Sequence, residues 1–172
     1  DNVGDVAGMG ADLFESYVGS IISAITLGII ATNPAGEAYG VIGAVFPLII
    51  SAVGIIASII GTFFVKGNDS TNPQKALNMG TYVAGAITII ASFLLSKAML
   101  GNTTGFFAIL IGLIVGTLIG QVTEIYTSAD HKHVQKIADQ SETGPATTII
   151  AGLAVGMGST AVPILLISVG IL

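Results

Sequence analysis

The run VIGAVFPLIISAVGIIASIIGTFFV occupies residues 41–65 and decides the fold class. It has no charged side chain over 25 consecutive residues, and its only polar side chains are hydroxyls. A helix needs about 20 mostly apolar residues to cross the hydrocarbon core of a membrane. Strands of soluble proteins are shorter than this run, and strands of membrane barrels alternate apolar and polar residues. The run therefore predicts a membrane-spanning helix.

Four further stretches have the same apolar character and sufficient length. They are residues 1–31, which are polar at their start, and residues 76–96, 106–122 and 145–172. Helix-breaking residues separate the stretches, as in Thr32-Asn33-Pro34. Asn72 is a suitable N-cap for the third helix, with Pro73 at its first helical position. We expect an all-α integral membrane protein with five transmembrane helices, forming one segment of a larger helical bundle.

The composition excludes several other classes of protein. Only 9% of the 172 residues are charged, 52% are apolar, and the mean hydropathy is +0.90. A typical soluble domain has about 25% charged residues, so this chain cannot cover a water-soluble surface. The net charge of -5, with five lysines and no arginine, excludes a basic nucleic-acid binder. The absence of cysteine excludes disulfides, thiolate catalysis and cysteine-ligated metals.

The lysines predict the orientation of the helices in the membrane. Four of the five, Lys66, Lys75, Lys132 and Lys136, lie in the connections after the second and fourth helices. Only Lys97 lies on the opposite side, at a helix end from which it can reach the interface. Because lysines favour cytoplasmic loops, we expect a cytoplasmic N-terminus and an external C-terminus.

Glycines and prolines inside the apolar runs predict how the helices pack and bend. Small residues four apart let helix backbones approach closely in lipid. This spacing occurs at Gly112, Gly116 and Gly120 of the fourth helix and at Gly152 and Gly156 of the fifth. We interpret both sets as packing faces. Two prolines, Pro47 and Pro163, lie inside apolar runs and are expected to kink them.

The longest polar segment, residues 123–144, is predicted to be an exposed loop. At its centre Asp130, His131 and His133 have a spacing that could hold a metal, but no third strong ligand is evident. An exposed loop is therefore the better interpretation of these residues. Glu124 is expected at the membrane interface and Glu37 in solvent in an external loop.

The most informative segment is DNVGDVAGMGADLFESY at residues 1–17. On an ideal α-helix at 100° per residue, with Asp1 at 0°, Asp5 falls at about 40°, Asp12 at about 20°, Glu15 at about -40° and Ser16 at about 60°. We call Asp1, Asp5, Asp12 and Glu15 the acidic stripe. At 1.5 Å per residue, Asp12 lies about 16 Å and Glu15 about 21 Å below Asp1. The acidic stripe therefore runs from the aqueous edge into the membrane.

Carboxylates at this depth need partners. A charge at the membrane centre costs at least about 2.5 kcal/mol. A purely structural interpretation is possible for all four acids. Asp1 and Asp5 could be solvated residues at a helix start, and Asp12 and Glu15 could belong to a structural ion pair inside the bundle. The functional interpretation is a divalent-metal site at the top, since paired aspartates are hard oxygen donors suited to Mg²⁺, with an ion path below.

Residues 1–17 resemble the signature of the membrane-bound, ion-pumping inorganic pyrophosphatases. Two further segments, Tyr126-Thr127-Ser128 and Ser141-Glu142-Thr143-Gly144-Pro145-Ala146-Thr147, also resemble that family. The resemblance runs along essentially the whole chain. Family members have sixteen transmembrane helices, so the chain would correspond to about the sixth to the tenth and be part of a longer protein. The resemblance also implies a prokaryotic cell membrane and a homodimer.

The resemblance assigns roles to individual residues. Asp1 matches a ligand of Mg²⁺ in the Mg-pyrophosphate complex, and Asp5 matches a catalytic aspartate close to metal that helps activate water. Asp5 and Asp12 match positions along the ion path, Asp12 at the gate below the hydrolytic site. Glu15 and Ser16 match the border of the transported-ion site in sodium-pumping members. Proton pumps of the plant type have their glutamate one turn later, where this chain has Gly19, which favours sodium.

The sequence therefore predicts part of an enzyme that hydrolyses Mg-pyrophosphate on the cytoplasmic side and transports Na⁺ or H⁺ outward. Mg²⁺ would be its cofactor, with K⁺ and Na⁺ as further cations. A secondary cation transporter without hydrolysis is the main alternative, and a packing module whose acids pair with lysines elsewhere is another. Because pyrophosphate needs lysines, arginines or metals, and the lysines here lie in loops, residues 1–172 alone are expected to be inactive.

Overall fold

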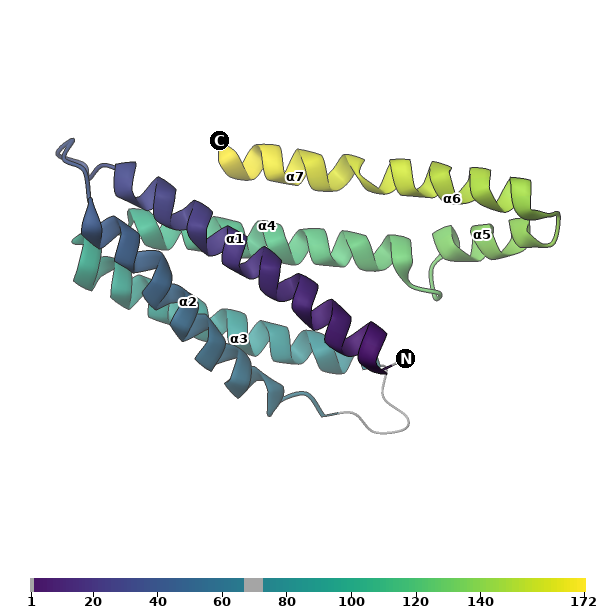
Figure 1. The fold of residues 1–172 in the computed structure, drawn as a ribbon, viewed down its shortest axis with the longest axis horizontal. Coiled ribbons are helices and arrows are strands. Elements are labelled where there is room, and N and C mark those ends of the chain that lie inside the picture. Colours follow the sequence, from purple (N-terminus) through teal and green to yellow (C-terminus); the bar gives the residue numbers. More distant parts are fainter. Residues whose placement is uncertain (1, 67–72) are drawn as a thin grey trace. The chain divides into compact units, whose positions relative to one another are not determined.

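The structure is a computed structural model that describes the backbone of residues 2–66 and 73–172. Over these residues the regular secondary structure is helical, apart from one isolated bridge between Thr32 and Ala38. Five helical segments are long and apolar enough to cross a membrane: residues 3–30, 41–62, 75–100, 104–141 and 145–171. The prediction of an all-α chain with five membrane helices is confirmed. The chain forms two compact units, Asp1–Ile109 and Leu110–Leu172, which are described separately (Figure 1).

In the first unit, α2 lies between α1 and α3. The elements are η1 (Asn2–Gly8), α1 (Met9–Ile30), α2 (Val41–Thr62), α3 (Pro73–Leu95) and η2 (Ser96–Leu100), followed by the start of α4 (Thr104–Thr127). Helix α2 contacts both α1 and α3. Helix α3 begins at Pro73, as the sequence predicts, whereas its expected cap, Asn72, lies outside the described residues. Pro47 lies within α2, which is continuous around it.

Two glycine pairs bring the helix backbones together. Gly28 of α1 lies against Gly43 of α2, and a Cβ built on either would overlap the backbone of the other. At the other end of α2, a Cβ on Gly61 would lie 2.7 Å from the carbonyl oxygen of Gly80. Only glycine permits such approaches, because any side chain would push the helix axes apart. These two contacts therefore fix the order α1–α2–α3.

Replacing Gly43 by alanine in the complete protein is expected to destabilise it by roughly 1–3 kcal/mol, the usual cost of overpacking. The added methyl would overlap the carbonyl of Gly28. Unfolding in mixed micelles with increasing sodium dodecyl sulfate measures the change. Gly54→Ala on the same helix is the matched control, because a Cβ there meets nothing within 4 Å among the described residues. Equal losses for both variants would contradict the proposed role of the Gly28–Gly43 contact.

The glycine faces predicted on the fourth and fifth helices have no partner among the described residues. A Cβ at Gly112, Gly116, Gly120, Gly152 or Gly156 meets nothing within 4 Å. Their role as packing faces stays a prediction. Close backbone approach instead occurs at Gly28, Gly43, Gly61 and Gly80, where isolated glycines face each other.

Side-chain hydrogen bonds order the connections of the first unit. Asn33 accepts bonds from the amides of Ala35 and Glu37 at 2.9 and 3.0 Å, and its own amide donates to the Glu37 carboxylate at 3.4 Å. Tyr39 bonds to Asn102 in the connection between η2 and α4. Buried Ser96 donates to the Asn102 carbonyl at 2.8 Å and accepts from the Phe106 amide at 3.2 Å. Glu37 is thus exposed but hydrogen-bonded, which the sequence did not indicate.

The second unit contains the rest of α4, with α5 (Lys132–Ser141), α6 (Pro145–Ser159) and α7 (Ala161–Ile171). The prediction of a loop over residues 123–144 is wrong in two places. Helix α4 continues to Thr127, and α5 occupies ten residues of the segment. Polar side chains mark where an apolar span ends. They do not end the helix itself, which can continue with polar residues beyond the span. Helix α5 packs against α6.

The fifth predicted helix is interrupted where its proline requires. Helix α6 ends at Ser159 and α7 begins at Ala161. Pro163 has no N–H to donate to the carbonyl of Ser159, four residues before it, so the regular ladder cannot continue there. The kink predicted from Pro163 is therefore seen as a break at Thr160.

Candidate functional site

The segment that carries the acidic stripe begins with a π-helix. Residues Asn2–Gly8 form η1, and the α-helix starts only at Met9. A π-helix bonds residue i to i+5 and has more residues per turn than an α-helix, so each residue turns through less than 100°. The ideal-helix angle predicted between Asp5 and Asp12 is therefore wrong. Single π turns are frequent at functional sites, and this one contains Asp5.

Within α1, the acids and the contact with α2 lie on opposite faces. With Asp12 at 0°, Glu15 lies at about -60° and Ser16 at about 40°, at 100° per residue. Tyr17 and Gly28 fall at about 140° and 160° on the same scale. Gly28 contacts Gly43, and the Tyr17 hydroxyl donates to the carbonyl of Ser51 in α2 at 3.0 Å. Helix α2 therefore covers the face opposite the acids, and Asp12, Glu15 and Ser16 face away from it.

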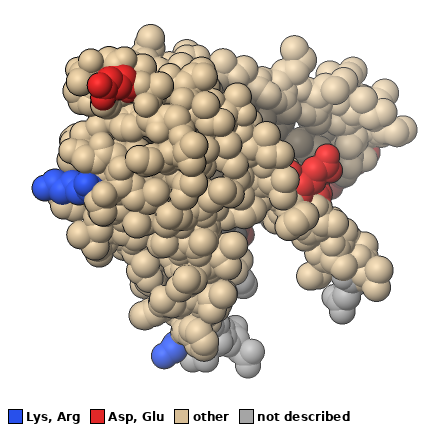
Figure 2. Space-filling view, turned by 60° about the vertical axis from the view of Figure 1, so that its left-hand side comes forward, with Lys and Arg blue, Asp and Glu red and all other residues tan. Residues whose placement is uncertain are grey.

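The described residues of the acidic stripe are exposed to solvent. The side chains of Asp5, Asp12, Glu15 and Ser16 are all exposed, and α1 has no buried residue. On the face drawn in Figure 2 the charged side chains are few and scattered. Because ionised carboxylates at membrane depth need partners, this face of α1 must be covered by cations or by other polar groups when the helix is in a membrane.

The metal ligands predicted from the sequence are only partly described. Asp1 lies outside the described residues. In the described part, no group of three or more histidine or acidic side chains is placed so that it could hold a metal. Asp5 offers hard carboxylate oxygens of the type that Mg²⁺ prefers, so its chemistry fits a magnesium ligand. A complete magnesium site would need further ligands beside this one described residue.

The two histidines of the polar segment are in α5 or at its start rather than in a loop. His133 stacks on Tyr126, with ring centroids 4.3 Å apart and an interplanar angle of 23°. His131 precedes the helix, and its Nδ1 is buried without a hydrogen-bond partner among the described residues. The two rings do not form a metal cluster with Asp130. Lys97 lies with its ammonium 5.0 Å from the centre of the Phe93 ring, consistent with a position at the interface.

Sequence reasoning missed the contacts that orient α1. Tyr17 was part of the quoted motif, yet nothing in its spacing indicated a bond to the α2 backbone. Helical spacing alone places Tyr17 and Gly28 on the side of the helix opposite the acids, and this signal could have indicated the face that contacts α2. The π-helical start of the segment has no sequence signal that we can identify.

Comparison with known proteins gives a match along the whole chain. A model of the family described as inorganic H⁺ pyrophosphatase matches residues 1–172. A protein of Clostridium tetani, named as an inferred K⁺-stimulated pyrophosphate-energized sodium pump, is 60% identical over the whole chain and 25% of its own length. A protein of Moorella thermoacetica, named as a K⁺-insensitive pyrophosphate-energized proton pump, is 48% identical over the same shares. The chain thus spans about a quarter of the length of the curated relatives that it matches.

Proposed function

The chain belongs to the family of inorganic H⁺ pyrophosphatases, and from this premise we propose that the complete protein hydrolyses Mg-pyrophosphate on the cytoplasmic side and transports Na⁺ outward. The observation that carries the proposal is the open acidic face of α1, which occurs in a chain 60% identical to an inferred pyrophosphate-energized sodium pump. No observation favours a secondary transporter without hydrolysis.

The upper part of the acidic stripe has the chemistry for hydrolysis. We assign Asp1 and Asp5 as carboxylate ligands of Mg²⁺, and Asp5 also as the group that orients and deprotonates the attacking water. Bound Mg²⁺ would neutralise phosphate charge and polarise the phosphoryl oxygens. Asp5 is exposed and lies in the π-helical turn at the N-terminal end of the span, so it is accessible to a substrate that approaches from the cytoplasm.

The lower part of the acidic stripe has the chemistry for cation transport. Asp12, Glu15 and Ser16 lie within about 100° of one face of α1, away from α2. Carboxylate and hydroxyl oxygens suit a dehydrated Na⁺, which would offset the cost of two acids at this depth. We propose Asp5, Asp12, Glu15 and Ser16 as the ion path. Because the 60% identical relative is named for sodium and K⁺ stimulation, and the 48% identical one for protons, we propose sodium as cargo and K⁺ as activator.

We also propose that residues 1–172 alone do not hydrolyse pyrophosphate. The substrate is strongly anionic and needs several cationic groups or metals, whereas this chain has no arginine and five lysines. The remaining ligands would come from other parts of the same polypeptide. A homodimer embedded in lipid is the assembly that the family resemblance implies.

The proposal is tested with the complete protein in sealed inverted vesicles, where the cytoplasmic side faces the medium. Adding Mg²⁺ and pyrophosphate outside should drive ²²Na⁺ into the lumen, in proportion to the phosphate released. Because pyrophosphate does not cross membranes, activity without permeabilisation also tests the predicted orientation. Pyrophosphate hydrolysis that moves neither sodium nor protons would contradict a pump.

A further inference from the structure

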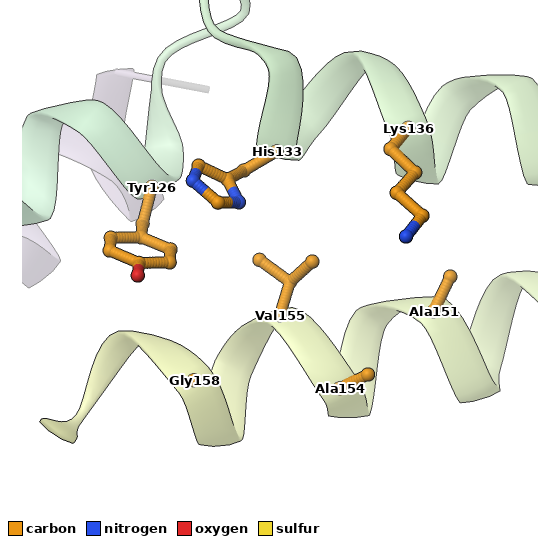
Figure 3. A pocket seen from close by; sticks show the side chains of 7 residues that line it. All are labelled: Tyr126, His133, Lys136, Ala151, Ala154, Val155 and Gly158. Atoms are coloured by element: carbon orange, nitrogen blue, oxygen red, sulfur yellow. The ribbon is translucent and has the colours of Figure 1, made fainter.

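A cavity of about 240 Å³ lies in the second unit, between α6 and the point where α4 gives way to α5 (Figure 3). Three polar side chains line it: Tyr126 from the last turn of α4, and His133 and Lys136 from α5. The wall from α6 consists of small and apolar residues, including Val155 and Gly158. The cavity therefore has a polar side and an apolar side.

The polar side of the cavity is cationic and ordered. The stacked rings of Tyr126 and His133 connect the end of α4 to the start of α5 and hold the imidazole in the wall. Lys136 follows one turn later, and Figure 3 shows its side chain directed toward α6. Lysine supplies three N–H donors, and an imidazole N–H adds another. No carboxylate lines the cavity, and Lys136 makes no ion pair within the described ranges 3–66 and 75–172.

The cavity follows the end of an apolar span, so we expect it to lie at the membrane surface. The apolar run of α4 ends at about Val122, and Tyr126 follows it by one turn. Tyrosines gather at the level of lipid headgroups, and lysines mark the cytoplasmic side. The cavity has a cationic wall beside an apolar wall at the expected membrane surface. These walls suit a ligand whose phosphate lies at the boundary between water and hydrocarbon.

We propose that this cavity binds a phosphate group at the cytoplasmic membrane surface, with Lys136 and His133 as its donors. The phosphate could be the headgroup of an anionic phospholipid or inorganic phosphate from the cytoplasm. The site is distinct from the acidic stripe, and its existence does not depend on the proposed hydrolysis.

The test uses the complete protein in detergent and native mass spectrometry, with phosphatidylglycerol and phosphatidylcholine of equal chain length. Wild type should retain phosphatidylglycerol in preference to phosphatidylcholine. Lys136→Gln should weaken retention of phosphatidylglycerol about tenfold, as expected for losing a charge-assisted hydrogen bond. His133→Phe keeps a stacking ring and removes the donors, so it should weaken retention by a smaller factor. Lys132→Gln is the matched control, because Lys132 is exposed on the same helix but does not line the cavity.

A second arm measures equilibrium binding of ³²P-labelled phosphate to the same variants. If Lys136→Gln lowers retention of the lipid but leaves phosphate binding unchanged, the ligand is a phospholipid. If it lowers phosphate binding and the lipid shows no such dependence, the ligand is inorganic phosphate. The proposal is overturned if Lys136→Gln matches wild type in both arms, or if Lys132→Gln causes an equal loss, which would indicate unspecific attraction to surface charge. Size-exclusion profiles and helical circular dichroism confirm that each variant is folded.

Discussion

Asp5→Asn in the complete protein is expected to lower Mg²⁺-dependent pyrophosphate hydrolysis at least about 100-fold, the lower range for losing a general base. Asparagine keeps the size of the side chain and one oxygen, but it removes the negative charge and the proton acceptor. Among the described residues the side chain of Asp5 is exposed, so we expect its substitution to disturb little packing. Turnover of the purified variant at saturating Mg²⁺ gives the measurement.

The matched control for this prediction is Asp139→Asn on α5. Asp139 is an equally exposed acid outside the acidic stripe, so its substitution changes the net charge by the same amount. Turnover should stay within about twofold of wild type, as for most surface substitutions. A folded Asp5→Asn variant with near-normal turnover would remove Asp5 from the catalytic site. Normal turnover that requires more Mg²⁺ would leave it a metal ligand only.

Glu15→Gln is expected to weaken the stimulation of hydrolysis by sodium while leaving Mg²⁺ dependence nearly unchanged. Glu15 lies within α1 on the face opposite the contact with α2, so the substitution should not disturb that contact. Glutamine cannot neutralise Na⁺, and the concentration of Na⁺ for half-maximal stimulation should rise at least about tenfold, because an ionic ligand contributes more than about 1.4 kcal/mol. Stimulation of hydrolysis and uptake of ²²Na⁺ into vesicles both report the effect.

Glu37→Gln provides a matched control for this second substitution. Glu37 is an exposed glutamate in the ordered turn after α1, where glutamine can still accept the bond from Asn33. Its sodium dependence should equal that of wild type. If hydrolysis instead acidifies the lumen at every sodium concentration, without ²²Na⁺ uptake, the protein is a proton pump. Glu15 would then hold a proton rather than a sodium ion.

The sequence indicated which residues are candidates for the site but not how they are arranged. The order of acids and glycines in residues 1–17 identifies the family, and the family match along 1–172 confirms it. The angular positions of Asp12, Glu15 and Ser16 relative to one another hold, because α1 is regular from Met9 onward. The position of Asp5 relative to them does not, because residues Asn2–Gly8 form a π-helix.

The sequence by itself determined the membrane class, the five spans, the break near Pro163 and the placement of the acids on α1. These follow from local properties: the length of an apolar run, the missing N–H of proline and the angle between successive residues on a helix. Each can be read from a short window of sequence, because solvent and backbone geometry act on every residue independently of its distant neighbours.

The tertiary structure alone decided which surfaces meet. It selected Gly28, Gly43, Gly61 and Gly80 for close approach and left Gly112, Gly116 and Gly120 of α4 without a close neighbour among the described residues. It bonded Tyr17 to α2 and thereby turned the acids away from that helix. It also placed the short α5 against α6, where a polar segment predicted only a loop. The physical reason is that lipid solvates any apolar face about equally well, so the choice of a partner depends on shape and hydrogen bonding between residues far apart in the sequence.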